Sequence, residues 1–406
     1  MGDDEDKVVE ESSDSSSSGD SGDSTTETSE QGFGSRLKDS IASVGIGLLL
    51  FIAAFPLLWK NEGCAVASYK GLSEGKGKVI SVDAAKIDPS NNSKLIHLTG
   101  QASTDETLKD NDFGISIKAI KLSRKAEMYQ WEEKVTEKKE KKVGGKEVTT
   151  KTTSYSKVWS SKVNDSSAFK KKAGHENPAV MEFADKKISA KDVKVGAYPL
   201  TDELIAKISG SEPLAFEAEQ MQTIPAALKA KAKKTEGGLY IGADPANPQV
   251  GDLKIKFEFV KPQPVSIIAQ QLNNTLTSFV PEKGEKILML QSGTVAADSM
   301  FKQAAEDVGM RTWILRLVGF IMMGAGLSMV FKPISTLLDV VPFLGSIASF
   351  GFGLVSFIVA LVLSLVTIAI AWIVARPIVA VILLLAGVGA FFGFRYYGQQ
   401  KKAKAA

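Results

Sequence analysis

The sequence predicts a multi-pass α-helical membrane protein with four spans and a large β-rich α+β extracytoplasmic or lumenal domain between spans 1 and 2. Two observations support this prediction. Apolar residues are concentrated in one run near residue 50 and in a block after residue 312, although 44% hydrophobic residues and a mean hydropathy of +0.02 would suit a soluble protein. Residues 60–312, in between, mostly alternate apolar and polar side chains with period two, as β-strands do.

The first span is predicted at residues 41–59. Residues 41–58 form an 18-residue run without a charge, which is about the minimum for crossing a hydrocarbon core of ~30 Å. Trp59 and Lys60 follow, as is common where a span meets the membrane surface. Because an acidic tail precedes this run, the run does not resemble a signal peptide, and we interpret it as an uncleaved anchor.

Three further spans are predicted near the carboxyl terminus, at residues 313–331, 343–375 and 377–394. The middle one would form about 50 Å of helix, too long for one upright span, so we expect it to tilt, to kink or to begin along the membrane interface. Basic flanking residues place residues 1–40 and the short basic tail 395–406 in the cytoplasm, and therefore residues 60–312 in the lumen.

The amino-terminal tail, residues 1–40, is expected to be disordered. Its first 35 residues carry eleven acidic residues against Lys7 alone and are rich in serine, so they offer too little apolar surface to offset the entropy lost on ordering. Serines beside acidic residues suggest phosphorylation, and a purely solubilising tail is the alternative.

A long basic hairpin is predicted at about residues 126–159 in the β-rich domain, with its turn at Gly144-Gly145, where both residues can adopt positive φ. Twelve lysines against six acids between residues 132 and 172 make its middle too charged to be buried. We expect the hairpin to project into solvent with a positive field. The alternative is that its lysines only prevent edge-to-edge strand pairing.

The sequence carries no motif for catalysis, nucleotide binding or a metal. No nucleophile elbow, phosphate-binding loop, HExxH pair or dinucleotide fingerprint occurs, and one cysteine and two histidines leave little for a metal cluster. His97 lies in an apolar strand and His175 in a turn, so both are expected to be structural. We therefore predict no enzymatic activity, no cofactor and no nucleic-acid partner.

Small residues at four-residue spacing in the last two predicted spans permit close helix approach, either within the bundle or between copies. They are Gly345, Ser349 and Gly353, followed by Gly389 and Gly393. Arg316 lies three residues inside its predicted span. We expect its side chain to extend to the lumenal interface in a structural role, with an ion pathway as the alternative.

Several short sequence motifs are more specific indicators of a protein family. Asn61-Glu62-Gly63 follows the first span, Glu127-Met128-Tyr129-Gln130-Trp131 begins the hairpin, and Gly174-His175 with Asn177-Pro178 comes after it. Two further motifs begin at Trp313 and Trp372. In this order the motifs resemble those of the LUMA (transmembrane protein 43) family, and the resemblance runs from about residue 40 to residue 397.

The resemblance implies a four-span protein of the endoplasmic reticulum and inner nuclear membrane, with both termini cytoplasmic or nucleoplasmic, or a cell-membrane protein if the chain is bacterial. In an animal it implies association with emerin, lamins and SUN-domain proteins, nuclear-envelope organisation and self-association. Two features depart from the family. Cys64 stands where the family usually has arginine, and would either form an intersubunit disulfide or be buried; the acidic tail is not a family feature.

We therefore predict a non-enzymatic scaffold in the lipid bilayer that assembles protein complexes through its lumenal domain and forms homo-oligomers. One face of the strand carries Glu127, Tyr129 and Trp131 and is expected to be partly exposed to solvent, which suits a protein interface. The same pattern is equally compatible with a core strand of the lumenal domain. The alternative function is a channel or transport-associated component. That function would depend on Arg316, Asp339 and Arg376, the ionisable residues nearest the predicted bundle.

Overall fold

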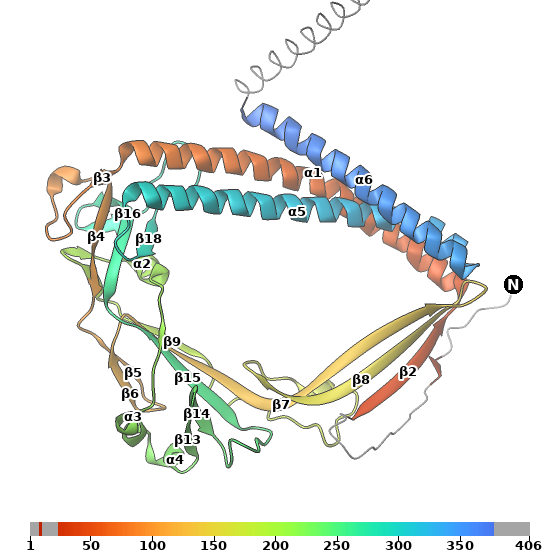
Figure 1. Cartoon of the computed structure of the whole chain (residues 1–406), viewed down its shortest axis with the longest axis horizontal. Coiled ribbons are helices and arrows are strands. Elements are labelled where there is room, and N and C mark those ends of the chain that lie inside the picture. The colour runs from red at the N-terminus through yellow and green to blue at the C-terminus, as the bar shows by residue number, and fades with distance from the viewer. Residues whose placement is uncertain (1–7, 10–22, 377–406) are drawn as a thin grey trace, which may run out of the picture.

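The computed structural model describes residues 8–9 and 23–376. Three long helices lie together along one side of the molecule, and a β-rich domain is attached at one end of them (Figure 1). A long β-hairpin extends from this domain to the opposite end of the helices, so that the chain forms a closed ring (Figure 1).

The long helices are α1 (Phe33–Lys78), α5 (Ala297–Leu338) and α6 (Pro342–Ala375). Each contains a stretch long and apolar enough to cross a membrane, in agreement with the spans predicted at 41–59, 313–331 and 343–375. Helices α1 and α5 continue well beyond their apolar stretches, because their polar halves pack on each other and carry the β-rich domain. The predicted span 377–394 and the tail 395–406 lie outside the described residues.

Helices α1 and α5 cross where both carry glycine. A Cβ added at Gly326 would lie 2.6 Å from the carbonyl oxygen of Gly47 and 2.7 Å from the amide nitrogen of Phe51, so the two backbones are in direct contact. The glycines predicted for packing lie elsewhere. Gly345 packs against Asp339 of the preceding turn, whereas Gly353 has open space where a Cβ would be. Ser349 is exposed and donates a hydrogen bond to its own helix, and Gly389 and Gly393 lie outside the described residues.

The β-rich domain contains two large sheets. The first has the order β1-β2-β8-β7-β15-β14-β13, with β9 beside β7 and β12 beside β15. Its strands are β1 (Val8–Val9), β2 (Ser24–Gln31), β7 (Lys121–Lys141), β8 (Glu147–Ser160), β9 (Lys186–Ser189), β12 (Glu212–Pro213), β13 (Ala232–Thr235), β14 (Gly238–Ile241) and β15 (Leu253–Val260).

The second sheet has the order β11-β10-β4-β16-β17, with β3 beside β4 and β18 beside β16, and β5 and β6 form a separate pair. Its strands and this pair are β3 (Ile80–Ser81), β4 (Leu95–Ser103), β5 (Thr107–Asp110), β6 (Ile115–Lys118), β10 (Lys194–Val195), β11 (Tyr198–Pro199), β16 (Gln263–Leu272), β17 (Thr275–Thr277) and β18 (Met289–Ser292). The short helices are α2 (Asp202–Lys207), α3 (Ala218–Thr223) and α4 (Ala226–Lys229).

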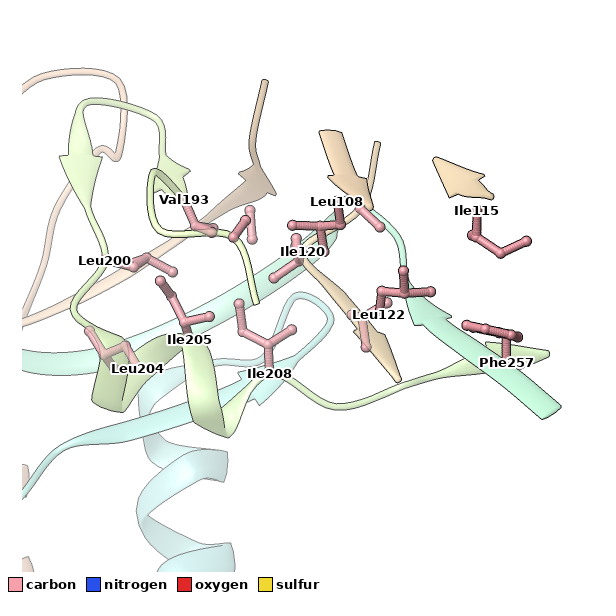
Figure 2. Packing of buried hydrophobic residues seen from close by; sticks show 14 of the residues in the cluster. Leu108, Ile115, Ile120, Leu122, Val193, Leu200, Leu204, Ile205, Ile208 and Phe257 are labelled. Atoms are coloured by element: carbon pink, nitrogen blue, oxygen red, sulfur yellow. The ribbon is translucent and has the colours of Figure 1, made fainter. Parts of the chain in front are cut away.

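Both sheets contribute to one hydrophobic core, because alternate residues of each strand point inward. On β7 the inward set includes Leu122, Ala126 and Met128, and Phe257 of β15 packs beside it. Figure 2 shows Ile205 of α2 and the following Ile208 packed near Leu122 and its neighbours.

The predicted hairpin corresponds to β7 and β8, and Gly144 and Gly145 form its turn with φ of 89° and 77°. The prediction that it projects freely into solvent is wrong at its tip. Gly144 N donates to Val340 O (3.0 Å), and Lys141 Nζ lies 2.8 Å from a carboxylate oxygen of Asp339. The tip is held because the buried Asp339 carboxylate needs cationic partners.

Part of the tail predicted to be disordered is a strand. Residues 24–31 form β2, which pairs antiparallel with β8 in the register Thr28 to Thr150. The acidic side chains of this segment meet basic ones of the domain, since Glu27 pairs with Lys170 and Asp23 with Lys171. Charge complementarity and an available strand edge therefore order a segment that its own composition would leave unfolded.

The pairing of β2 with β8 has a consequence for membrane topology. β2 precedes α1 and β8 follows it, so a bilayer crossed by residues 41–59 would separate the two strands. The charged hairpin cannot pass through hydrocarbon. The closed ring and a bilayer-spanning α1 therefore exclude each other.

Candidate functional site

A single carboxylate, that of Glu62, connects all three long helices. Glu62 is 1% exposed and lies on α1 one turn after the predicted span. Arg316 of α5 donates to both of its oxygens, from Nε to Oε1 (2.7 Å) and from Nη2 to Oε2 (2.8 Å). Trp372 of α6 donates from Nε1 to Oε2 (3.0 Å). We call Glu62, Arg316 and Trp372 the polar clasp.

Neighbouring residues of the same sequence motifs add further contacts around the polar clasp. Asn61 Nδ2 donates to the carbonyl oxygen of Thr312 (3.1 Å), and the Arg316 guanidinium lies over the Trp313 ring at 4.7 Å from its centroid. Gly63 has open space around it. A forked arginine with further donors is the geometry that a buried carboxylate requires. The contacts of Arg316 therefore support the structural role expected for it.

A second ion-pair cluster lies at the other end of the helices. Arg36 of α1 donates from Nη2 to Asp339 Oδ2 (2.7 Å) and from Nη1 to the carbonyl oxygen of Gly145 (2.5 Å). Glu62 follows Arg36 by 26 positions along the helix, a rise of about 39 Å, which lies between a hydrocarbon core of ~30 Å and a whole bilayer of ~40–45 Å. The two clusters therefore mark the ends of an apolar zone of membrane thickness.

The two sequence motifs of the β-rich domain, which begin at Glu127 and Gly174, lie in contact with each other. Asn177 Oδ1 accepts a hydrogen bond from Trp131 N (2.7 Å), and Asn177 Nδ2 donates to Trp131 O (2.9 Å). Gln130 Nε2 donates to the carbonyl oxygen of Lys162 (2.6 Å), and Gln130 Oε1 accepts from Asn164 N (2.8 Å). We call this set the amide knot. It fixes β7, just beyond the end of its pairing with β15, against the segment that follows β8.

His175 completes this arrangement from the turn at Gly174, whose φ is 83°. Its buried ring stacks on Tyr155 at 4.1 Å between centroids and meets the edge of Trp131 at 4.6 Å. Nδ1 lies 3.1 Å from the carbonyl oxygen of Lys171, so this nitrogen is the donor and carries the proton. Pro178 lies beside Gly251. The contacts of His175 match its expected structural role.

An aromatic face lies on the outer side of β7 and β8, and consists of Tyr129, Trp131 and Trp159, all half-buried. Tyr129 and Trp159 rings lie 5.0 Å apart, and Lys254 Nζ lies 4.0 Å from the Trp159 centroid. Glu127 is half-buried on the same side of β7, while Met128 and Gln130 are buried on the other. The sequence placed Tyr129 and Trp131 on this face but not Trp159, whose register opposite Tyr129 follows only from the hairpin pairing.

The remaining candidate residues have simple surroundings. His97 Nε2 lies 2.9 Å from the carbonyl oxygen of Val295, in keeping with its expected structural role. Cys64 is exposed, which removes the alternative that it is buried. Within residues 8–9 and 23–376, no group of three or more His, Cys, Asp or Glu side chains is arranged to hold a metal ion.

Comparison with known proteins identifies the family. A sequence model of the family described as Transmembrane protein 43 matches residues 128–377, more than half of the chain. The chain belongs to the transmembrane protein 43 family. Human Transmembrane protein 43 is 30% identical over 371 residues, covering 89% of this chain and 90% of the human protein. The Transmembrane protein 43 homolog of Drosophila melanogaster is 28% identical over 360 residues, covering 86% and 93% respectively.

The match confirms the resemblance to LUMA and the membrane character of the chain. No solved structure matches it. The region matched by the transmembrane protein 43 model contains the amide knot, the aromatic face and two members of the polar clasp, Arg316 and Trp372; Glu62 precedes it.

Proposed function

We propose that this protein is a non-enzymatic membrane scaffold of the endoplasmic reticulum and inner nuclear membrane. Its lumenal β-rich domain binds other proteins and further copies of itself, and both termini face the cytoplasm or nucleoplasm. In an animal cell the partners are of the emerin, lamin and SUN-domain kinds. Four spans hold the domain at the membrane, with the polar clasp at its lumenal edge and residues 1–40 on the opposite side.

The aromatic face is the observation that supports a binding role. Large rings with polar edges that are neither buried nor fully exposed are typical of the centres of protein interfaces. Lys157 Nζ lies 4.8 Å from the Trp131 centroid, so the face is also cationic at its rim. By contrast, the residues with catalytic chemistry, His97, His175 and Glu62, are engaged in structural hydrogen bonds.

Co-purification tests this proposal. Two copies with different tags are expressed together with a SUN-domain protein, solubilised in a mild detergent and captured through one tag. We expect the second copy and the SUN-domain protein to co-purify, and Trp159→Ala with Tyr129→Ala to reduce both. Leu272→Ala, at an exposed apolar residue of β16 in the second sheet, is the control. A chain that stays monomeric and partner-free, or binding unaffected by the aromatic variants, would contradict the proposal.

The alternative function, a channel, would need ionisable residues that are available to ions. Arg316 and Asp339, two of the ionisable residues that it needs, are each engaged in a short ion pair. An ion-flux assay in liposomes separates the two functions, because flux abolished by Asp339→Asn would favour the channel and no flux is expected for the scaffold.

A further inference from the structure

An apolar groove runs between α1 and α6 in the zone between the two ion-pair clusters. Its volume is about 370 Å³, and Phe55, Pro56 and Trp59 of α1 face Leu363, Val366 and Ile370 of α6 across it. This volume lies within the range of ~300–1,000 Å³ usual for small-molecule sites. Its lining is almost entirely hydrocarbon, so a polar ligand cannot fill it.

A second hollow of about 240 Å³ continues from the groove toward the β-rich domain, and Trp59 lines both. It has a different character, because the side chains of Lys70 and Lys283 line it together with Val374. Lys283 is held in place by its loop, since a Cβ at Gly284 would lie 2.5 Å from the carbonyl oxygen of Ala67 on α1. The groove therefore has an apolar body and a basic mouth.

Among the residues that the structure describes, no carboxylate lies within ion-pair distance of the ammonium group of Lys70 or Lys283. Three of the acids nearby are already paired, Glu62 with Arg316, Glu74 with Lys78 and Glu285 with Arg311, and Glu282, the residue before Lys283, lies beyond ion-pair distance of its ammonium group. Two unneutralised lysines beside an apolar groove form a site for a molecule with one anionic end and one hydrocarbon end.

The position of the mouth identifies the kind of molecule. It lies next to the polar clasp, where the apolar zone ends, and Trp59 is 42% exposed there, as a tryptophan at a membrane interface would be. Lysines at this depth extend their ammonium groups toward lipid phosphates. In the membrane arrangement proposed above, the apolar part opens toward the bilayer, so a soluble ligand would have no access to it.

We propose that this groove binds an anionic glycerophospholipid, with an acyl chain between α1 and α6 and the headgroup phosphate at Lys70 and Lys283. The inference rests on the membrane arrangement proposed above. The lipid would fill the space between two helices that meet through the polar clasp at one end, and so contribute to the packing of α6.

Lipid titration of the delipidated full-length protein, followed by native mass spectrometry, tests this site. The probes are phosphatidylserine and phosphatidylcholine with identical acyl chains. We expect Lys70→Gln with Lys283→Gln to weaken phosphatidylserine binding about tenfold and phosphatidylcholine binding less, because both lipids carry the phosphate but only phosphatidylserine has a net negative charge. Lys94→Gln with Lys109→Gln, two exposed lysines of the β-rich domain, is the charge-matched control.

A second variant tests the apolar part. Val366→Trp fills the groove and is expected to abolish binding of both lipids at this site, whereas Leu361→Trp, on another side of α6, is expected to have no effect. Equal wild-type affinity for the two lipids would overturn the proposal. So would full phosphatidylserine binding in both the lysine and the Val366 variants, as expected if the predicted span 377–394 occupies the groove.

These outcomes are independent of the scaffold proposal. The aromatic-face variants are expected to bind lipid normally, and the Lys70 and Lys283 variant is expected to co-purify with its partners. Loss of lipid selectivity with intact association would therefore refute only the lipid site.

Discussion

At the residue scale, the polar clasp explains how a carboxylate can be buried at the membrane edge. Removing Glu62 from water is costly, and the cost is offset only because Arg316 binds both oxygens and Trp372 adds a third donor. Each partner belongs to a different helix. The stability of the three-helix arrangement therefore depends strongly on one side chain.

Substitution of Glu62 tests this dependence. We expect Glu62→Gln to lower the free energy of unfolding by about 3 kcal/mol, because Arg316 loses its counterion in a part-buried site. Glu306→Gln on α5, which breaks an exposed pair with Lys302, should cost less than about 1 kcal/mol. Thermal unfolding in detergent, followed by circular dichroism, measures both. Equal losses would show that the polar clasp has no special role.

A buried arginine in the β-rich domain makes the stability of the fold depend on pH. Arg124 Nη1 lies 2.7 Å from Asp112 Oδ2 and also contacts Asp110. This hydrogen bond is the main reason that the pKa of Asp112 lies below its ordinary value of 3.8. Because the folded pKa is lowered, the stabilisation is complete above about pH 3.8 and is lost as the pH falls below it.

Asp112→Asn checks this dependence. The variant should be less stable than the wild type at pH 6, and the difference should shrink as the pH falls toward 3. Urea unfolding monitored by tryptophan fluorescence across this range measures it. A stability difference that is constant with pH would contradict the role of the Asp112 charge.

At the element scale, the close crossing of α1 and α5 depends on glycine. We expect Gly326→Ala to destabilise the protein by about 1–3 kcal/mol, because its Cβ would meet the backbone of Gly47 and Phe51 rather than a movable side chain. Gly351→Ala in α6, where a Cβ would meet nothing within 4 Å, is the matched control and should be neutral or stabilising. Thermal melting temperatures of the two variants compare them directly, and indistinguishable values would contradict the predicted steric clash.

Elements with a strong local pattern were predictable from the sequence. The strands at 95–103, 147–160 and 253–260 follow from period-two alternation, and the apolar parts of the three long helices follow from hydropathy. The polar continuation of α1 to Lys78 was not predictable, because hydropathy detects only the apolar part of a helix. β2 was missed because its partner strand, not its composition, orders it.

Pairing across long sequence distances was the other part that could not be predicted. Glu62 and Arg316 were both singled out, as were Trp131 and Asn177, but residues separated by 254 and 46 positions show no local sign of contact. The fold brings them together. The identity of the important residues was therefore more predictable than their partners.

At the scale of the whole molecule, two arrangements are in competition. In the closed ring, β2 pairs with β8 and the hairpin tip pairs with Arg36 and Asp339. In the membrane arrangement that we propose, the bilayer separates residues 1–40 from the β-rich domain, so these contacts open and the hairpin lies in the lumen. The polar clasp is compatible with both arrangements, since its residues stay on one side.

The most direct test of the membrane arrangement is labelling of single cysteines in sealed microsomes. With Cys64→Ser as background, Thr28→Cys reports on the tail and Lys139→Cys on the hairpin, and a membrane-impermeant maleimide is added from the cytosolic side. We predict that Thr28→Cys is labelled without detergent and that Lys139→Cys is labelled only after detergent opens the vesicles. Labelling of Lys139→Cys in sealed vesicles would contradict the account.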